Sequence, residues 1–194
     1  KGEYQYCHPN DHVNLSQSTN DAYPTAFKLC FILHNEDLVR ELKCLVKAFR
    51  AKGKEFVNVL KMGRTQLQDA VPVRLGQEFA AYSAVIRRDI KRIKTAELEM
   101  HKINMGGSAI GTSINVDPQY LKEIDEVLSK VAGYELEKAD DLIDATQNLD
   151  GFVSVSAALK TCAVNLSKIA NDLRLMSSGP RTGIGEIVLP AKQN

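Results

Sequence analysis

The sequence has no tryptophan and few aromatic residues, which make up 6% of its 194 positions. It also lacks an excess of charge, because 25 lysine and arginine residues oppose 24 aspartate and glutamate residues and leave a formal net charge of +1. Affinity for a phosphate surface needs clustered cationic residues. We therefore expect neither a nucleic acid nor a membrane as a partner.

Long apolar runs and paired cysteines are missing too. No stretch approaches the roughly 18 apolar residues of a membrane-spanning helix, and the start lacks the apolar core of a signal peptide. Cys7, Cys30, Cys44 and Cys162 form no CxxC pair and no cluster with zinc-like spacing. We expect free thiols in a reducing compartment, and so a cytoplasmic protein, in which Cys30, Cys44 and Cys162 are buried in helices.

Apolar residues recur at steps of three and four along most of the chain. From Thr25 to about Lys61 this spacing predicts one long helix or two collinear ones, with Gly53 as a possible break. Asp117-Pro118 predicts the start of a shorter helix that ends near Gly133. A cleaner series predicts a packing seam. It consists of Leu75, Phe79, Tyr82, Ile86, Ile90, Ile93 and Met100.

A last long helix is predicted from about Asp144 to Met176. Its stretch from Phe152 to Leu159 carries no charge, which predicts burial on all sides. Convincing strand pairs are scarce, so the fold class expected is all-α. Several long helices in one domain over residues 1–194 leave apolar surface uncovered, which favours a long-helix bundle shared between subunits.

Two polar motifs carry the candidate chemistry. In the first, Ser16 to Asp21, six consecutive polar residues precede a helix start, where hydroxyl groups, amides and backbone N–H groups can converge on an anion. A helix cap needs only one such residue, although a cap alone stays an open alternative. In the second, Thr65 and Gln66 can donate uncharged hydrogen bonds to a carboxylate or amine. The alternative for this motif is a loop that joins two helices.

His8 and His12 flank Pro9-Asn10-Asp11, and such a cluster could bind a metal or an anion. No third ligand has a recognisable spacing. We therefore expect a structured polar loop and no metal site.

Four segments together resemble the aspartase/fumarase superfamily, in order and at plausible spacing. They are HPNDHVNLSQSTNDAYPTAF (8–27), LKMGRTQLQDAVPVRLGQEF (60–79), GGSAIGTSIN (106–115) and DLRLMSSGPRTGIGEIVLP (172–190). The resemblance covers essentially the whole chain. It implies the central helical domain of that fold and a homotetramer built through the helix bundle.

Within the superfamily, Ser18-Thr19-Asn20-Asp21 and Gly63-Arg64-Thr65-Gln66 look like the aspartate ammonia-lyase branch. Class II fumarases typically have serine at the position of Thr19 and histidine at that of Gln66. A fumarase, or a non-catalytic structural protein like the crystallins of this superfamily, stays as an alternative.

The resemblance implies a cofactor-free β-elimination that converts L-aspartate reversibly to fumarate and ammonia through an enediolate, and it leaves divalent-cation activation open. Ser18 and Thr19 would hold the β-carboxylate, Asn20 and Gln66 would contact the amino group, and Thr65 would bind the α-carboxylate. His8, Asn10 and Asp11 match a second anion site described for fumarases.

The resemblance also implies that parts of the enzyme lie outside this sequence. The family's base is a serine in a loop of the form GSSxMPxKxN, which we expect just after Asn194. Because the N-terminal domain, this loop and the C-terminal domain are absent, we expect the 194 residues alone to be inactive. Each site of the tetramer would draw Ser18 and Thr65 from different chains.

Overall fold

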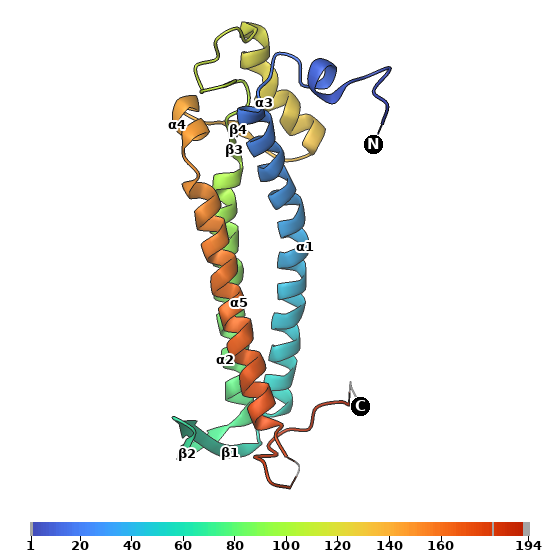
Figure 1. Ribbon diagram of the computed structural model, residues 1–194. Helices are drawn as coiled ribbons and strands as arrows, with labels where there is room; N and C mark the ends of the chain where they lie inside the picture. Colours follow the sequence, from blue (N-terminus) through green and yellow to red (C-terminus); the bar gives the residue numbers. More distant parts are fainter. Residues whose placement is uncertain (1, 180, 192–194) are drawn as a thin grey trace. The chain divides into compact units, whose positions relative to one another are not determined.

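The structure is a computed structural model, and it describes residues 2–179 and 181–191 (Figure 1). Five α-helices dominate the described part of the chain, so the all-α prediction is confirmed. The helices are α1 (Thr19–Glu55), α2 (Leu75–Glu97), α3 (Pro118–Ala132), α4 (Leu142–Gln147) and α5 (Asp150–Met176), and short helical turns lie at Pro9–Val13 and Leu98–Met100. The strands are β1 (Leu60–Thr65), β2 (Gln68–Arg74), β3 (Lys102–Ile103) and β4 (Glu137–Lys138). None of the described helices combines the length and the apolar character needed to cross a bilayer.

The chain divides into two compact units. The first unit contains the described residues up to Asp37 together with Lys94–Val155. The second contains Leu38–Ile93 and the described residues from Ser156 onward. Helices α1, α2 and α5 each contribute residues to both units.

The second unit has a core of three helical seams, whose buried residues recur at steps of three and four on α1 and α2 and at steps of seven on α5. An aromatic cluster forms part of it: the ring of Phe79 lies 5.4 Å from Phe56, 5.7 Å from Tyr82 and 6.2 Å from Phe49 between centroids. Aromatic pairs at these separations add about 0.5–1.5 kcal/mol beyond area burial. The seams consist of Val39, Leu42, Val46 and Phe49 on α1, Leu75, Phe79, Tyr82 and Ile86 on α2, and Cys162, Ile169 and Met176 on α5.

One position of the predicted α2 seam is wrong. Asp89, not Ile90, is the buried residue, with none of its surface exposed. Its two carboxylate oxygens accept hydrogen bonds from Nδ2 of Asn165 on α5 at 3.0 and 2.9 Å, and Arg92 lies 2.5 Å from Oδ1. These partners make the burial of a carboxylate tolerable, since a buried charge is otherwise strongly destabilising.

The predicted break at Gly53 is also wrong, because α1 continues to Glu55. The backbones of α1 and α2 approach each other closely at Gly53 and Gly76. Glycine is needed at position 76, because a Cβ there would lie 2.3 Å from the carbonyl oxygen of Gly53. The approach closes the base of the β1–β2 hairpin, where the Gly76 amide donates to Phe56 and the Leu75 amide donates to Val59.

In the first unit, the helix predicted after Asp117 is confirmed. The Asp117 carboxylate accepts from the amides of Gln119 and Tyr120 at the start of α3, and Gly133 ends the helix with φ of 75°. Both are the local cap signals on which the prediction rested. The buried side chains of this unit include Thr25, Lys28, Ile32 and Asn35 of α1, and Met100, Ile103, Asn104 and Leu136.

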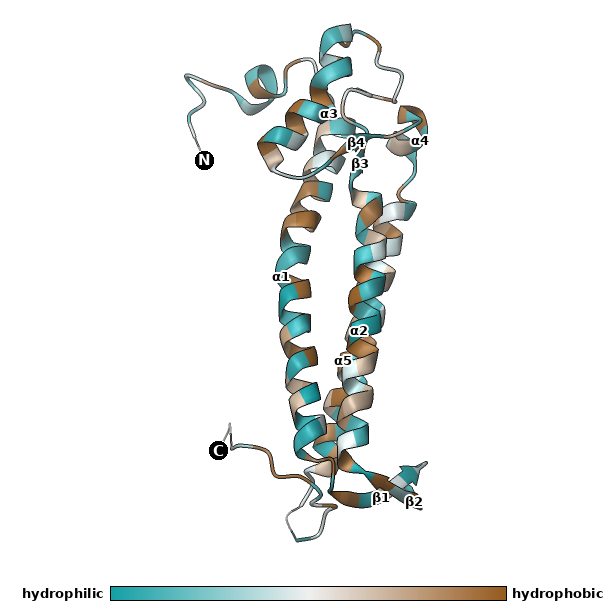
Figure 2. Cartoon of the chain, turned by 180° about the vertical axis from the view of Figure 1, so that it is seen from behind, coloured by the Kyte–Doolittle hydropathy of each residue, from teal (hydrophilic) through white to brown (hydrophobic). Residues whose placement is uncertain are grey.

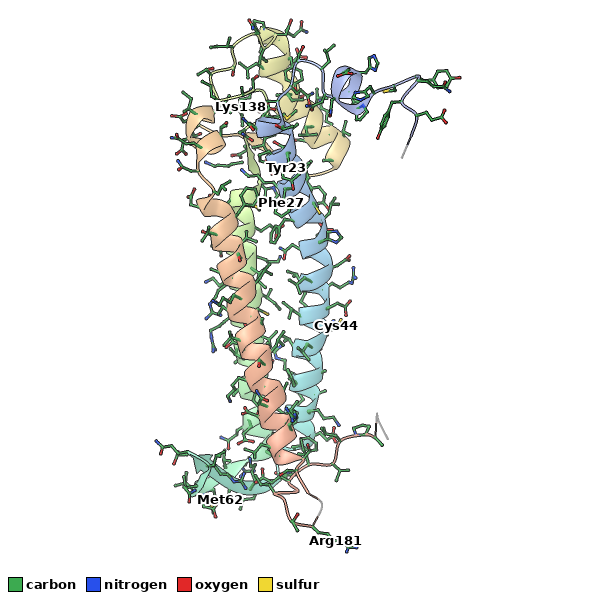
Figure 3. All side chains as sticks on the ribbon, viewed as in Figure 1. Tyr23, Phe27, Cys44, Met62, Lys138 and Arg181 are labelled. Carbon is green, nitrogen blue, oxygen red and sulfur yellow. The ribbon has the colours of Figure 1, made fainter. Side chains whose placement is uncertain are left out.

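The predicted helix from Asp144 to Met176 is two helices, α4 and α5, interrupted after Gln147. Burial on all sides of its stretch from Phe152 to Leu159 is wrong for the single chain, because Val153 is 65% exposed. The Phe27 ring lies 5.5 Å from the Phe152 ring and is still 54% exposed (Figure 3). Hydrophobic (brown) and hydrophilic (teal) positions are interspersed along the ribbon of α1 (Figure 2).

The cysteine predictions are confirmed only in part. All four cysteines, which lie within the described residues, are free. Cys162 is buried, whereas Cys30 and Cys44 are exposed on α1. The reason is the position of the buried seam of α1, which runs through Ile32 and Val46: each cysteine is two residues away from it and lies on the exposed side of the helix.

Candidate functional site

The first polar motif lies in the first unit, immediately before and at the start of α1. Ser18 is half-buried and its Oγ accepts from the Asn20 amide at 3.1 Å, while Thr19 and Asn20 are exposed. The structure therefore brings Ser18, Thr19 and Asn20 together at the N-terminus of a 37-residue helix. Such a terminus presents unpaired N–H groups and partial positive charge, which suit an anion.

Asp21 fixes the backbone of this motif. Its carboxylate is 1% exposed; Oδ1 accepts from the Ser18 amide at 3.0 Å, and Oδ2 accepts from the amides of Gly106 at 3.2 Å and Ser108 at 2.9 Å. The first bond, with the Ser18 cap, forms a reciprocal pair of the capping-box type. The other two tie the motif to the third resembling segment, which begins at Gly106.

Asn20 is tied to the same segment. Its Nδ2 donates to the Ala109 carbonyl at 2.7 Å, and its own carbonyl accepts from Nδ2 of the buried Asn104 at 2.9 Å. Asn104 also donates to Oγ1 of Thr146 in α4 at 3.0 Å. The side-chain amide of Asn20, which the resemblance places against the amino group of the substrate, thus has a defined orientation.

His8, Asn10 and Asp11 form a local turn. Nδ1 of His8 accepts from the amides of Asn10 and Asp11 at 3.3 and 3.2 Å, and the His8 amide donates to Nδ1 of His12 at 2.8 Å. The same ring nitrogen lies 3.2 Å from the Asp11 carboxylate. This is the structured polar loop that the sequence predicts.

The second motif lies in the second unit on a β-hairpin, and this hairpin is the connection between α1 and α2. Thr65 pairs with Gln68, which leaves Gln66 and Leu67 as a two-residue turn with φ of 51° and 64°. Positive φ at both positions is the geometry of a type I′ turn, which usually has asparagine and glycine. The turn presents Thr65 and Gln66 as exposed side chains.

A cavity of about 400 Å³ adjoins this turn. Its lining includes Gln66 and Leu67 of the turn, Tyr82 of α2, and Lys168 and Asp172 of α5. The Tyr82 hydroxyl donates to Asp172 at 3.1 Å, and burial together with this carboxylate raises the pKa of Tyr82. The tyrosine therefore stays neutral across the physiological range.

A cluster of ion pairs lies beside the same cavity. Nζ of Lys61 is 2.9 Å from Glu78 and 2.8 Å from Glu186, and Nη2 of Arg64 is 2.7 Å from Glu186. The pKa of Glu186 is affected by burial, which raises it, and by hydrogen bonds from Arg64 and Lys61, which lower it; the net result lies below the ordinary value. The hydrogen bond to Glu186 in turn raises the pKa of Arg64.

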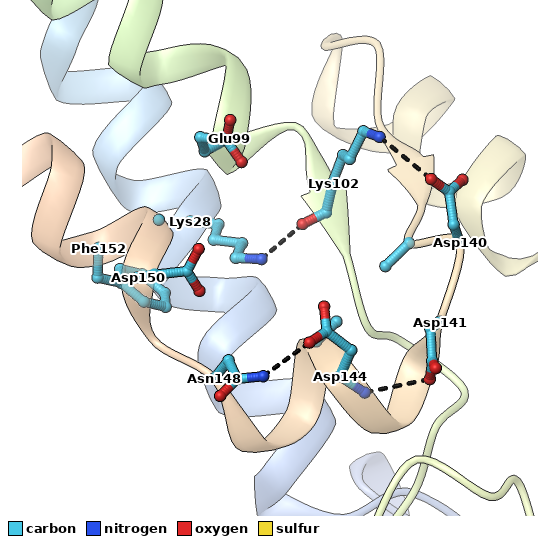
Figure 4. A pocket seen from close by; sticks show the side chains of 12 residues that line it. Lys28, Glu99, Lys102, Asp140, Asp141, Asp144, Asn148, Asp150 and Phe152 are labelled. Carbon is cyan, nitrogen blue, oxygen red and sulfur yellow. Dashed lines mark hydrogen bonds and ion pairs between the residues drawn. The ribbon is translucent and has the colours of Figure 1, made fainter.

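The first unit contains a further cavity, of about 230 Å³, that is rich in carboxylates (Figure 4). Nζ of Lys28 donates to the Lys102 carbonyl at 2.5 Å, and burial lowers the pKa of Lys28. Asp141 caps α4 and Asp144 accepts from Asn148, so these carboxylates bind groups of the protein itself. Among residues 2–179 and 181–191, no three His, Cys, Asp or Glu side chains are grouped to hold a metal ion.

A family model described as lyase matches residues 1–194. The aspartate ammonia-lyase of Bacillus subtilis (strain 168) is 53% identical over 193 residues, and that of Pseudomonas canavaninivorans is 56% identical over 194 residues. Each match covers 100% of this chain and 41% of the relative. The chain thus spans about two fifths of the length of these relatives.

Two solved structures match this chain over most or all of its length. The fumarate lyase:delta crystallin from Brucella melitensis, solved with bound cobalt, has a TM-score of 0.94 and 51% identity, and the match covers 100% of this chain and 42% of that one. The class II fumarase from Schistosoma mansoni has a TM-score of 0.91 and 32% identity, covering 97% of this chain and 43% of that one.

Proposed function

The chain belongs to the lyase family of the aspartase/fumarase superfamily, and on that premise we propose that the whole protein is an aspartate ammonia-lyase. The observation that carries the proposal is the N-terminus of α1, where Ser18, Thr19 and Asn20 lie at the positive end of a long helix with backbones fixed by Asp21. This arrangement suits an anion that gains charge during the reaction.

The proposed reaction is a β-elimination without a cofactor. A base takes the proton from C3 of L-aspartate, and the electron pair moves into the β-carboxylate to form an enediolate. When that pair returns, the C2–C3 double bond forms, the C–N bond breaks and ammonia leaves, which gives fumarate. Ser18 and Thr19 donate hydrogen bonds to the β-carboxylate, where the negative charge increases in the transition state.

The remaining contacts come from Asn20 and the hairpin turn. Thr65 binds the α-carboxylate, and Asn20 and Gln66 contact the amino group. Thr65 and Gln66 carry no charge, so they can orient the substrate without neutralising the base. The base itself is the serine expected after Asn194. The described residues end at Ala191, so the final residues before that loop, Lys192–Asn194, lie outside them.

Assembly completes the proposed site. Each site draws on three subunits of a homotetramer, with Ser18 and Thr65 from different chains. Exposed apolar residues such as Phe27 and Val153 on the long helices support a packing partner. His8, Asn10 and Asp11 belong to a second anion site near the start of the chain, and the enzyme acts in the cytoplasm.

The test is the formation of fumarate by the whole protein, followed by its ultraviolet absorbance with L-aspartate and, separately, with L-malate. Turnover of aspartate is expected. Thr65→Ala removes one hydrogen bond to a charged group, which corresponds to a loss of about 10- to 100-fold in kcat/KM. Turnover of malate alone would instead make the protein a fumarase.

The fumarase alternative is supported by the TM-score of 0.91 with the class II fumarase from Schistosoma mansoni. Thr19 and Gln66 oppose it, since class II fumarases typically have serine and histidine at these positions. If neither substrate is turned over, a structural role becomes the better explanation.

A further inference from the structure

The hairpin that bears Thr65 and Gln66 needs support from outside itself. An isolated two-stranded hairpin is marginally stable in water. Its turn residues, Gln66 and Leu67, both have positive φ, which disfavours residues with a side chain. Of the seven residues of β2, only Val73 is not exposed. The turn therefore depends on how β1 is attached to the rest of the second unit.

Two charged side chains attach β1. Lys61 and Arg64 are 8% and 20% exposed, and both make an ion pair with Glu186, at 2.8 and 2.7 Å. Glu186 is itself 13% exposed, so its removal would leave two largely buried cations without this partner, which costs more than the loss of a surface ion pair. Arg64 directly precedes Thr65, and its position therefore sets that of the turn.

Glu186 is in turn fixed to the end of α5. Its backbone amide donates to the Met176 carbonyl at 2.8 Å, and the Gly185 amide donates to the Ser178 carbonyl at 2.8 Å. Nζ of Lys61 also lies 3.6 Å from the sulfur of Met176. A continuous series of contacts thus runs from α5 through Glu186 and Arg64 to Thr65.

We infer that Glu186 is a positioning residue for the substrate contacts of the hairpin. It acts through Arg64 to hold Thr65 and Gln66 in place, and it does not touch the substrate. The inference rests on the proposed function for the identity of the substrate. The attachment of the hairpin by Glu186 stands independently of it.

The test compares Glu186→Gln with Asp69→Asn in the whole protein. Asp69 is the matched control, because it also faces Arg64, but at 3.9 Å and with a side chain that is 77% exposed. Amide hydrogen exchange is measured over residues 60–74. Glu186→Gln is expected to speed exchange there, and Asp69→Asn is expected to leave it unchanged. Unchanged exchange in Glu186→Gln would overturn the attachment, whatever reaction the protein catalyses.

Kinetics then separates positioning from general damage. If Thr65 and Gln66 lose their placement, binding weakens in the ground and transition states alike, so KM for L-aspartate rises about tenfold, or about 1.4 kcal/mol, while kcat changes little. A purely structural defect reduces the active fraction instead, which lowers the apparent kcat at constant KM. That second pattern, or faster exchange with unchanged kinetics, would overturn the inference.

A conservative variant covers the case in which Glu186→Gln does not assemble. Glu186→Asp keeps the negative charge but moves it away from Arg64 by the length of one methylene group. Its KM for L-aspartate is therefore expected to lie between the wild-type value and the tenfold higher value of Glu186→Gln. A wild-type KM in Glu186→Asp would contradict the inference. If the wild-type protein turns over malate and not aspartate, the proposed function fails, and the same comparison is made with malate.

Discussion

Replacing Gly76 by alanine should destabilise the protein although alanine is the better helix former. A Cβ at this position would lie 2.3 Å from the carbonyl oxygen of Gly53 and 3.0 Å from the backbone carbonyl of Phe56. Both neighbours are backbone atoms, which cannot rotate away as a side chain can. Helices α1 and α2 must therefore separate by about 1 Å to restore a normal contact, as expected for an overpacked site.

The size of the effect follows from two opposed terms. Overpacking a buried contact costs about 1–3 kcal/mol, and the gain in helix propensity from glycine to alanine is at most about 1 kcal/mol. We expect a net loss of about 1–2 kcal/mol in the free energy of unfolding. The contact lies at the base of the hairpin, so Gly76→Ala should also raise KM through Thr65 and Gln66.

The measurement is denaturant unfolding of the whole protein at one fixed concentration, since the stability of an oligomer depends on concentration. Gly53→Ala is the matched control: its Cβ would lie 3.2 Å from the Gly76 carbonyl oxygen, so only a shift of a few tenths of an ångström is needed. If Gly76→Ala is as stable as the wild type, the close approach of the two backbones is refuted.

Three more predictions concern other parts of the fold. Gly111→Ala, at φ of 86° and with its Cβ 2.4 Å from Cα of Ile143, should cost about 2 kcal/mol or more in thermal or denaturant unfolding. Asn165→Leu should lower the free energy of unfolding by about 3 kcal/mol, because it leaves buried Asp89 without its amide donor. Replacing both Asp89 and Asn165 by leucine should recover most of that loss in the same unfolding measurement. The pKa of Glu186 is lowered, so its carboxylate stabilises the fold at pH values above the ordinary pKa of 4.5. This stabilisation is lost as the pH falls through the pKa of the folded state. The free energy of unfolding of Glu186→Gln should therefore fall less than that of the wild type in an acid titration.

The parts of the fold that the sequence predicts well are those decided by neighbouring residues. The helix between Asp117 and Gly133 has its cap, its proline and its terminal glycine within 17 positions, and the structure has the same boundaries. The start of α1 is predicted less well: the sequence predicts the helix from Thr25, whereas it begins at Thr19, so Asp21 lies in its first turn.

The parts that sequence reasoning missed depend on partners far along the chain or on unusual local geometry. Asp89 can replace Ile90 in the seam because Asn165, 76 positions later, supplies hydrogen bonds to its carboxylate in addition to the contact with Arg92. The hairpin was missed because Gln66 and Leu67 are not turn formers, although the turn puts both at positive φ. Nothing near Glu186 in sequence indicates Arg64, which lies 122 positions away.

The buried pair of Asp89 and Asn165 has a consequence for how the helices choose their alignment. Leucine, isoleucine and phenylalanine in a repeating seam fit almost equally well if α5 slides along α2 by one heptad, because apolar contacts are not directional. Such a slide would bring Ala158 or Asp172 to the place of Asn165 and would leave the Asp89 carboxylate without its amide donor. The pair thus penalises shifted alignments more than it strengthens the correct one, and in this way two polar side chains set the register of a largely apolar interface.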